Sequence, residues 1–467
     1  MVTKVSQTFP LLPLLLIGAV IFILVSQIDT VRTLLTRARG EPADIKVDTQ
    51  AIIGPLPRVW RNLAQGGETG GLNLAPLLSQ LTPLHPEYIR IDHLYDFYVT
   101  VNRDDTGNLT FDWTKLDQLL ASLTALGSKP FISLSYMPAV LSDDIVGPPA
   151  NWSDWASVVR STMEHISGRA GLNLTDVYYE VWNEPDLFGQ WKTYGDKNYL
   201  TLYSYAAAGA RQAQNVQAFK FGGPAITAFY PGWAKALFNF VLTNQIRLDF
   251  FSWHRYHRDL DQYLEDVGDL NLILEDYPNL AITLEKIITE SGHDSDIDPG
   301  YDSLYSAAHT LALTRTLTGL IDKLFTFEIQ DGQDPNGQAF WGRWGLFTHD
   351  SFGSTPKPRF FALSLLEQLS SDRLSLAGEG TWVKGLAAQQ GESTQVLLVN
   401  YDPRGQHSEN VPVTFTSLSS SSFTLSESFL LGRQRQLSLA TSAAELRHSL
   451  FMPANSAALL TLTPTSP

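Results

Sequence analysis

The sequence predicts an α/β protein that contains a (β/α)8 TIM barrel, followed by an all-β sandwich and preceded by a transmembrane helix. Short apolar runs alternate with longer amphipathic stretches over about 300 residues, which is typical of βα units around a parallel sheet. The C-terminal part is instead rich in Thr, Ser and Val and shows no helical period. The N-terminal part contains a long apolar stretch without charge. These three patterns predict three structural units.

The N-terminal segment 1–40 is predicted to be a membrane anchor or an uncleaved signal. Residues 9–28 carry no charged side chain, and about 20 helical residues span about 30 Å of hydrocarbon. A cleaved signal peptide is the alternative, but no small-x-small cleavage site follows the run. We expect a membrane-anchored chain with its domains outside the cytoplasm. Three arginines that follow the run favour the opposite orientation by the positive-inside rule, so the topology stays open: Arg32, Arg37 and Arg39. Residues 41–51 are polar and are predicted to be a linker.

Residues 52–370 are predicted to form the barrel. Eight short apolar runs are the candidate strands: 58–64, 87–95, 130–137, 177–184, 219–226, 248–256, 286–292 and 324–332. Helix-like segments such as 112–127 and 153–171 lie between them, and 357–370 supplies the closing helix. An open doubly wound sheet is the structural alternative. The glycines of AQGGETGG (64–71) do not have the spacing of its phosphate-binding turn.

Residues 371–467 are predicted to form the β-sandwich. Short runs such as TQVLLVNYD, VPVTFTSL and NSAALLTLTP are separated by Gly, Pro, Asn and Ser. Runs of this length and spacing are typical of a small all-β domain.

Composition excludes several classes of function. The chain of 467 residues has a formal net charge of −15, whereas a nucleic-acid-binding surface needs clustered Lys and Arg. Cysteine is absent, which excludes disulfides, thiolate nucleophiles and cysteine-based metal sites. His85, His165 and His309 show no metal-ligand spacing. The sequence therefore predicts no metal and no cofactor, and it does not indicate an oligomeric state.

Two glutamates stand at predicted strand ends, each directly before a chain breaker. Glu184 precedes Pro185, and Glu290 precedes Ser291 and Gly292. The C-terminal strand ends form the functional face of a (β/α)8 barrel, and the fourth and seventh strands lie across its mouth from one another. Two carboxylates there can stand about 5 to 5.5 Å apart, the separation that retaining glycoside hydrolysis requires. One must then be protonated while the other stays ionised.

Four motifs carry a resemblance to a known family: VWNEPD (181–186), DFFSWHRYH (249–257), IITESG (287–292) and KPRFFALSLL (357–366). They resemble clan A retaining glycosidases, and most of all glycoside hydrolase family 39, which contains β-xylosidases and α-L-iduronidases. The similarity covers roughly residues 52–370. It implies a retaining hydrolase that acts on O-glycosidic bonds of oligo- or polysaccharides by double displacement, with carbohydrate as its partner. Glu184 would be the general acid/base and Glu290 the nucleophile.

The resemblance also implies substrate-binding roles for six further residues. Asn183 would bind the sugar 2-hydroxyl, and Arg90 would hold Glu290 ionised. Tyr256 or His254 would orient the same carboxylate or a sugar hydroxyl. The aromatic rings of Trp341 and Trp344, in FWGRWG, would stack on a sugar face.

Some features depart from the family pattern and leave the substrate open. Family members often have His-Gly after the arginine of the second strand, whereas this chain has RIDHLYD, so the roles of Asp92 and His93 are undefined. Asp186 matches iduronidase-like members and Trp191 matches xylosidase-like ones. Two alternatives to a hydrolase also remain. One is a catalytically weak carbohydrate-binding barrel, and the other is a transglycosylase that uses the same residues.

Overall fold

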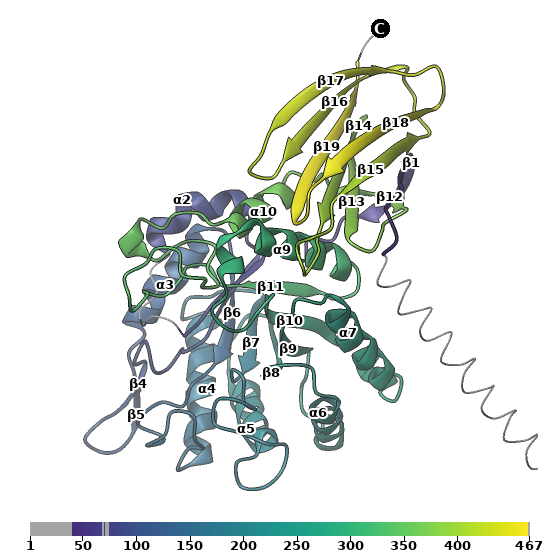
Figure 1. The fold of residues 1–467 in the computed structure, drawn as a ribbon. Coiled ribbons are helices and arrows are strands. Elements are labelled where there is room, and N and C mark those ends of the chain that lie inside the picture. The colour runs from purple at the N-terminus through teal and green to yellow at the C-terminus, as the bar shows by residue number, and fades with distance from the viewer. Residues whose placement is uncertain (1–39, 68–69, 71–73, 466–467) are drawn as a thin grey trace, which may run out of the picture.

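The computed structural model describes residues 40–67, 70 and 74–465. A barrel and a β-sandwich make up this part of the chain (Figure 1). The predicted membrane helix at 9–28 and nearly all of segment 1–40 lie outside the described residues. Among the helices that the structure describes, none is long and apolar enough to cross a membrane.

Within the described residues, eight parallel strands close the barrel in chain order. They are β2 (Asn62–Gln65), β3 (Tyr88–Ile91), β6 (Lys129–Leu134), β7 (Val177–Val181), β8 (Phe219–Ile226), β9 (Phe250–Tyr256), β10 (Glu285–Gly292) and β11 (Lys323–Phe327). The ring closes where β11 pairs with β2, with Phe325 opposite Asn62. Each strand overlaps a predicted run. The closed barrel is therefore confirmed, and the open sheet is excluded.

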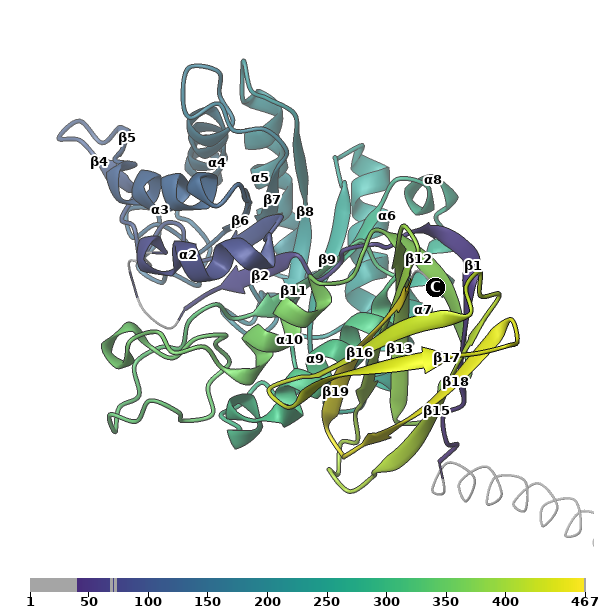
Figure 2. The ribbon, with the colours of Figure 1, turned by 90° about the horizontal axis from the view of Figure 1, so that it is seen from above.

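Helical segments follow the strands and cover the barrel. They are η1 (Ala75–Leu77), α2 (Leu78–Leu81), η2 (Thr82–Leu84), α3 (Thr114–Ala125), α4 (Trp152–Ile166), α5 (Tyr199–Gln212), α6 (Pro231–Asn244), α7 (Asp261–Leu274), α8 (Pro278–Ala281), η3 (Pro299–Asp302), α9 (Leu304–Leu317), η4 (Asp350–Phe352) and α10 (Pro358–Leu366). A hairpin of β4 (Val101–Arg103) and β5 (Leu109–Phe111) is inserted before α3. Figure 2 shows the sandwich beside α9 and α10, away from this hairpin.

Aromatic side chains fill the barrel interior below its mouth. Phe131, Tyr178, Phe250 and Phe325 form a buried cluster there, and the rings of Phe131 and Tyr178 stack at 5.1 Å. Large rings fill this space at close to crystal density. The polar side chains at the strand ends therefore lie above a tightly packed apolar cluster that excludes water.

The predicted sandwich is confirmed, and it packs against α9. Its strands are β1 (Ile45–Pro55), β12 (Asp372–Ala377), β13 (Val383–Gln390), β14 (Ser393–Asn400), β15 (Glu409–Thr416), β16 (Ser422–Phe429), β17 (Gln434–Ala440), β18 (Glu445–Met452) and β19 (Ser456–Pro464). Hydrogen-bonded neighbours follow the order β17-β16-β19-β14-β13-β12-β1-β15-β18. The inward side chains of these strands form a core separate from that of the barrel.

The linker predicted at 41–51 is wrong, because most of this segment belongs to β1. Residues 45–48 pair in parallel with β15, and β1 also pairs antiparallel with β12. Ile45, Val47 and Thr49 are buried, whereas Lys46 is exposed. This alternation is what a strand with one buried face requires. The segment looked like a linker because the exposed positions that alternate with the buried ones are polar.

Candidate active site

Six of the eight predicted site residues meet at the C-terminal end of the barrel. Arg90 lies on β3, Asn183 and Glu184 follow β7, His254 and Tyr256 end β9, and Glu290 lies on β10. Neighbouring strand registers place His254 opposite Glu290. The fold thus brings together side chains that are up to 200 positions apart in the sequence.

Arg90 is the hub of this cluster, and its side chain is fully buried. Its Nε donates to Glu180 at 2.7 Å, its Nη1 to Glu290 at 2.9 Å and its Nη2 to the Asn183 carbonyl oxygen at 2.6 Å. A buried guanidinium needs such partners, because removing it from water is costly. Arg90 therefore fixes the position of Glu290 and supplies a positive charge beside it.

Glu290 is held by donors on both of its oxygens. Arg90 contacts Oε1, and the Tyr256 hydroxyl donates to Oε2 at 2.7 Å. Burial raises the pKa of Glu290, and the charges of His254 and Arg90 and the Tyr256 hydrogen bond act against that shift. Because both contacts favour the charged form, Glu290 is the better stabilised anion of the two glutamates.

Glu184 lies in a different environment, in the turn that follows β7. Its backbone has a positive φ of 45°, a conformation that non-glycine residues rarely adopt and that is found at functional sites. Burial first, and then the neighbouring charge of Asp186, raise the pKa of Glu184 to about 8. At neutral pH this side chain therefore keeps its proton, as a general acid must.

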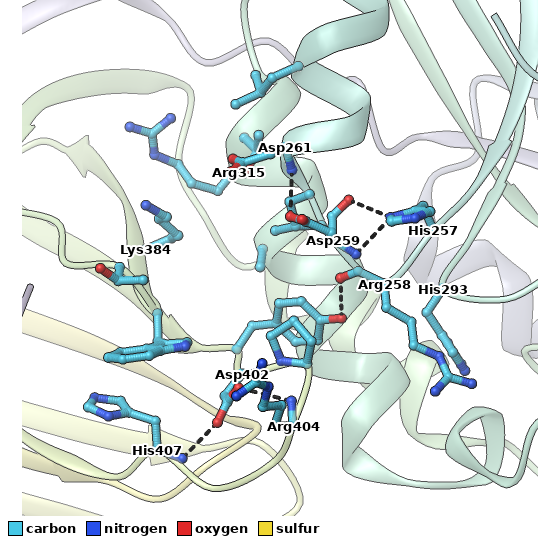
Figure 3. Close-up of a pocket in the computed structure, with 18 of the residues that line it drawn as sticks. His257, Arg258, Asp259, Asp261, His293, Arg315, Lys384, Asp402, Arg404 and His407 are labelled. Carbon is cyan, nitrogen blue, oxygen red and sulfur yellow. Dashed lines mark hydrogen bonds between the residues drawn. The ribbon is translucent and has the colours of Figure 1, made fainter. Parts of the chain in front are cut away.

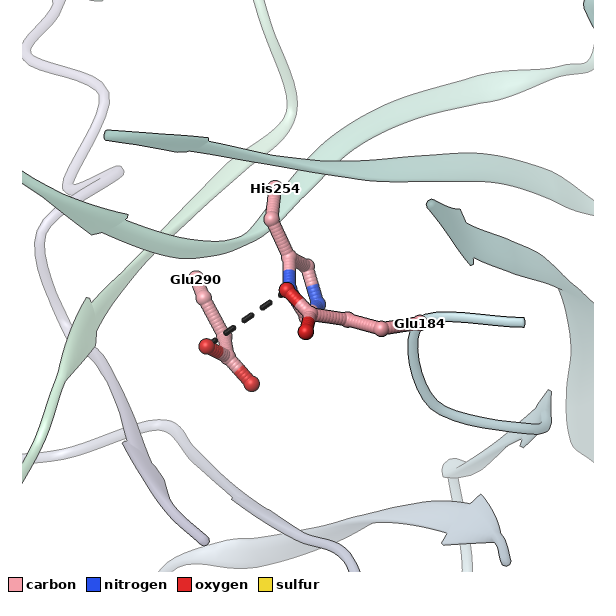
Figure 4. Close-up of side chains that lie close together, drawn as sticks. All are labelled: Glu184, His254 and Glu290. Atoms are coloured by element: carbon pink, nitrogen blue, oxygen red, sulfur yellow. Dashed lines mark hydrogen bonds and ion pairs between the residues drawn. The ribbon is translucent and has the colours of Figure 1, made fainter. Parts of the chain in front are cut away.

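His254 lies between the two glutamates (Figure 4). Its Nδ1 is 2.8 Å from Oε1 of Glu184 and 3.5 Å from Oε2 of Glu290. Burial lowers the pKa of His254, and the neighbouring charge of Glu290 acts against that shift. One oxygen of each glutamate and one ring nitrogen all lie within 4.8 Å of one another. This close approach fits the short carboxylate separation of retaining glycosidases.

The same trio has the ligand types that a divalent cation accepts. Glu290 is, however, already bound by Arg90 and Tyr256. The prediction that the chemistry needs no metal stays a prediction.

Sequence reasoning missed two residues that complete the cluster. Glu180 is fully buried on β7 and binds Arg90. Tyr136, which follows β6, accepts a hydrogen bond from the amide of Asn183 at 2.9 Å. A charged residue inside the apolar run VYYEV was a usable signal for Glu180, because a buried carboxylate requires a cation. Tyr136 is the second-last residue of the run PFISLSYM and was visible as a polar residue near the strand end.

The two predicted sugar-stacking tryptophans lie in the loop after β11. Trp344 packs edge-on against Phe327 at 5.3 Å, and the Arg343 guanidinium lies 3.5 Å from its ring centroid. Arg343 lies 5.2 Å from the ring of Trp341. Both rings are partly exposed. Their sugar-stacking role stays a prediction.

A cavity of about 1330 Å³ lies between the barrel and the sandwich (Figure 3). Tyr256 reaches it, but neither catalytic glutamate lines it. Its charged side chains are largely paired, since Arg258 bonds to Asp294 at 2.7 Å and Arg315 to Glu379 at 2.8 Å. This cavity therefore belongs to the interface between the two domains and is separate from the cluster around Glu184 and Glu290.

Comparisons with known proteins agree with this geometry. A β-xylosidase of Caldicellulosiruptor saccharolyticus is 29% identical over 322 residues, covering 63% of this chain and 64% of the relative. A β-xylosidase of Geobacillus stearothermophilus is 24% identical over 302 residues, covering 58% of each protein. The matches thus span less than two thirds of the length of these relatives.

The crystal structure of a monomeric β-xylosidase from Caulobacter crescentus CB15 shares the fold, with a TM-score of 0.76 and 23% identity. That likeness covers 91% of this chain and all 100% of the other. The sequence profile described as "Glycosyl hydrolases family 39" matches residues 43–399, which include the whole barrel and the site described above. The chain belongs to glycosyl hydrolase family 39.

Proposed function

We propose that this protein is a retaining glycoside hydrolase, β-xylosidase-like in substrate, that works by double displacement. The observation that carries the proposal is the unequal pair of carboxylates at the barrel mouth. Glu184 has a pKa raised to about 8, whereas Glu290 receives hydrogen bonds from Arg90 and Tyr256. An acid and an anion within reach of one anomeric carbon are what this reaction requires.

In the first step, a carboxylate oxygen of Glu290 attacks the anomeric carbon while the bond to the leaving oxygen breaks. Glu184 gives its proton to that oxygen, so the leaving group departs as a neutral alcohol. In the second step, the ionised Glu184 takes a proton from water. The water oxygen then bonds to the anomeric carbon, and the ester bond to Glu290 breaks. Configuration is retained because the carbon is inverted twice.

Asn183 is suited to bind the sugar 2-hydroxyl. Its carbonyl oxygen accepts from Arg90, and one amide hydrogen goes to Tyr136. The amide group carries two hydrogens, so one donor remains for the substrate. A hydrogen bond at the 2-hydroxyl strengthens toward the oxocarbenium-like transition state.

The choice of xyloside rests on the curated relatives, which are β-xylosidases. A transglycosylase would use the same two glutamates and differs only in whether a sugar or water reaches the intermediate. A binding protein without turnover has no need of a protonated acid beside a stabilised nucleophile. The geometry therefore favours an enzyme over a binding barrel.

The test is covalent labelling with a 2-deoxy-2-fluoro xyloside that has a good leaving group. We expect mass spectrometry to find one adduct, on the peptide that contains Glu290, and none in a Glu290→Gln variant. Glu285→Gln is the matched control, because Glu285 begins the same strand at the opposite end of the barrel. An adduct on another residue, or no adduct with any fluoro-sugar of a panel, would contradict the proposal.

A further inference from the structure

Asp92 lies at the barrel mouth, two residues beyond Arg90 and directly after β3. Its side chain faces Gly66, where an added Cβ would come within 2.8 Å of Oδ2 of Asp92. After burial, Asp92 is the main cause of the raised pKa of Tyr136, whose hydroxyl binds Asn183. Asp92 also contributes, after burial and other charges, to the raised pKa of Glu184. These relations indicate that its carboxylate lies near Tyr136 and Glu184.

The carboxylate of Asp92 has no hydrogen-bond donor among the residues that the structure describes, although Asp92 is only 5% exposed. Its oxygens are not among the fully enclosed polar atoms without a partner, so they face open space at the mouth. Burial raises the pKa of Asp92, which reflects the cost of this arrangement. A buried polar group without a protein partner is unusual and indicates a ligand contact.

We propose that Asp92 accepts hydrogen bonds from hydroxyl groups of the sugar seated beside Glu290, and that it selects neutral sugars over uronates. The inference rests on the proposed glycosidase function and deepens it. Sugar hydroxyls are donors that would satisfy the carboxylate, and bonds to a charged acceptor are stronger than neutral ones. A sugar that carries its own carboxylate would instead meet a like charge in a site of low dielectric.

The nearby cations are largely committed to the protein itself. The donors of Arg90 go to Glu180, Glu290 and Asn183. Arg359 is buried and bonds to the backbone carbonyls of Phe327 and Trp344.

Two further cations lie near the loop after β11. Lys357 is held between Asp302 at 2.7 Å and Asp331 at 2.9 Å. Arg343 lies over the ring of Trp344.

The experiment compares wild type with Asp92→Asn and Asp92→Ala on three kinds of substrate: an aryl β-xyloside, its monodeoxy analogues and the corresponding aryl uronide. We expect Asp92→Ala to lower kcat/KM on the xyloside by about 10- to 100-fold, the worth of a hydrogen bond to a charged acceptor. In wild type, removing the contacted hydroxyl from the substrate should lower kcat/KM by a similar factor. In the Asp92→Ala variant, the same removal should change kcat/KM little. Asp92→Asn should reduce the preference for xyloside over uronide by about tenfold or more.

Asp105→Asn is the matched control, because Asp105 is an exposed carboxylate on the same β3 to α3 connection. It removes the same charge and should leave all three substrates unaffected. If Asp92→Ala fails to fold, the Asp92→Asn variant still carries the test.

Unchanged kcat/KM in both Asp92 variants would overturn the inference. So would equal losses for every deoxy analogue in wild type and variant, which indicate a merely structural role. A wild-type preference for the uronide would overturn it as well. Fluoro-sugar labelling separates these failures from that of the proposed function. If Glu290 is labelled but the Asp92 variants have unchanged kcat/KM, only the role of Asp92 is refuted. If the wild-type protein is not labelled, both the proposed function and the role of Asp92 are refuted.

Discussion

A Glu184→Gln substitution should affect substrates according to how much their leaving group needs a proton. Glu184 has a pKa of about 8, so at pH 7 about nine molecules in ten carry that proton. Glutamine has the same size and can still contact His254, which lies 2.8 Å from Glu184. It cannot donate a proton to the leaving oxygen. The substitution therefore removes the acid and leaves the shape of the pocket.

The magnitude follows from the role of the proton. General acid catalysis contributes about 10²- to 10⁴-fold when the leaving group is basic. A dinitrophenolate leaves without protonation, so Glu184→Gln should slow bond cleavage of such a xyloside less than about tenfold. Methoxyphenyl or alkyl xylosides should lose the full factor in kcat/KM.

The assay is a series of aryl xylosides that span leaving groups of different acidity, measured for both proteins across pH. In wild type, kcat/KM should fall above about pH 8, where Glu184 loses its proton. This basic limb should vanish in Glu184→Gln and should move to lower pH in Asp186→Asn, because the charge of Asp186 is the second cause of the raised pKa after burial. Equal losses for all leaving groups, or a basic limb that persists in Glu184→Gln, would refute the assigned role.

The same variant has a stability signature with a definite sign. The folded pKa of Glu184, about 8, lies above its ordinary value of 4.5, so the folded state binds this proton more tightly. The stability that this contributes is fully present below about pH 4.5 and is lost as the pH rises through about 8. The loss has an upper bound of about 5 kcal/mol. Because Gln resembles the protonated form, Glu184→Gln should melt above wild type at pH 8, and the two proteins should converge near pH 5.

Two further substitutions test the environment of Glu290. Tyr256→Phe removes a hydrogen bond that lowers the pKa of Glu290, so the acid limb of kcat/KM should move to higher pH. Tyr178→Phe, which removes a tyrosine to glutamate bond at the far end of the barrel, should leave that limb in place. Arg90→Met leaves Glu180 and Glu290 buried without their cation, and denaturant unfolding should show a loss of about 3–5 kcal/mol. A loss below about 1 kcal/mol would contradict the hub role of Arg90.

The barrel was predictable because both faces of its strands are buried. Mostly apolar runs such as VYYEV and FKFGGPAI stand out against the amphipathic helices between them. The strand at 45–55 was missed because it buries one face only, so polar residues dilute its apolar half. Its partners β12 and β15 lie more than 300 positions later in the sequence. No local signal reveals a pairing of that range.

The place of the candidate site was predictable where a residue type conflicts with its surroundings, as with Glu184 and Glu290 at apolar strand ends. Their partners were harder to assign. Tyr136 meets Asn183 only through the order of strands around the barrel, and a lone tyrosine at the end of a run resembles ordinary packing. Whether the Asp92 carboxylate finds a hydrogen-bond donor depends on the side chains that the other strands bring to the barrel mouth. A property of that kind exists only in three dimensions.

The two glutamates differ because of the strands that face them. Glu290 lies on β10, between Tyr256 of β9 and the Arg90 side chain that crosses from β3, so two donors favour its charged form. Glu184 is buried in a turn and lies within reach of the charge of Asp186, so its charged form is disfavoured. Exchanging the two roles would require moving the Arg90 contact to the other side of the mouth. The proposed assignment of acid and nucleophile thus follows from the strand order and not from the carboxylates themselves.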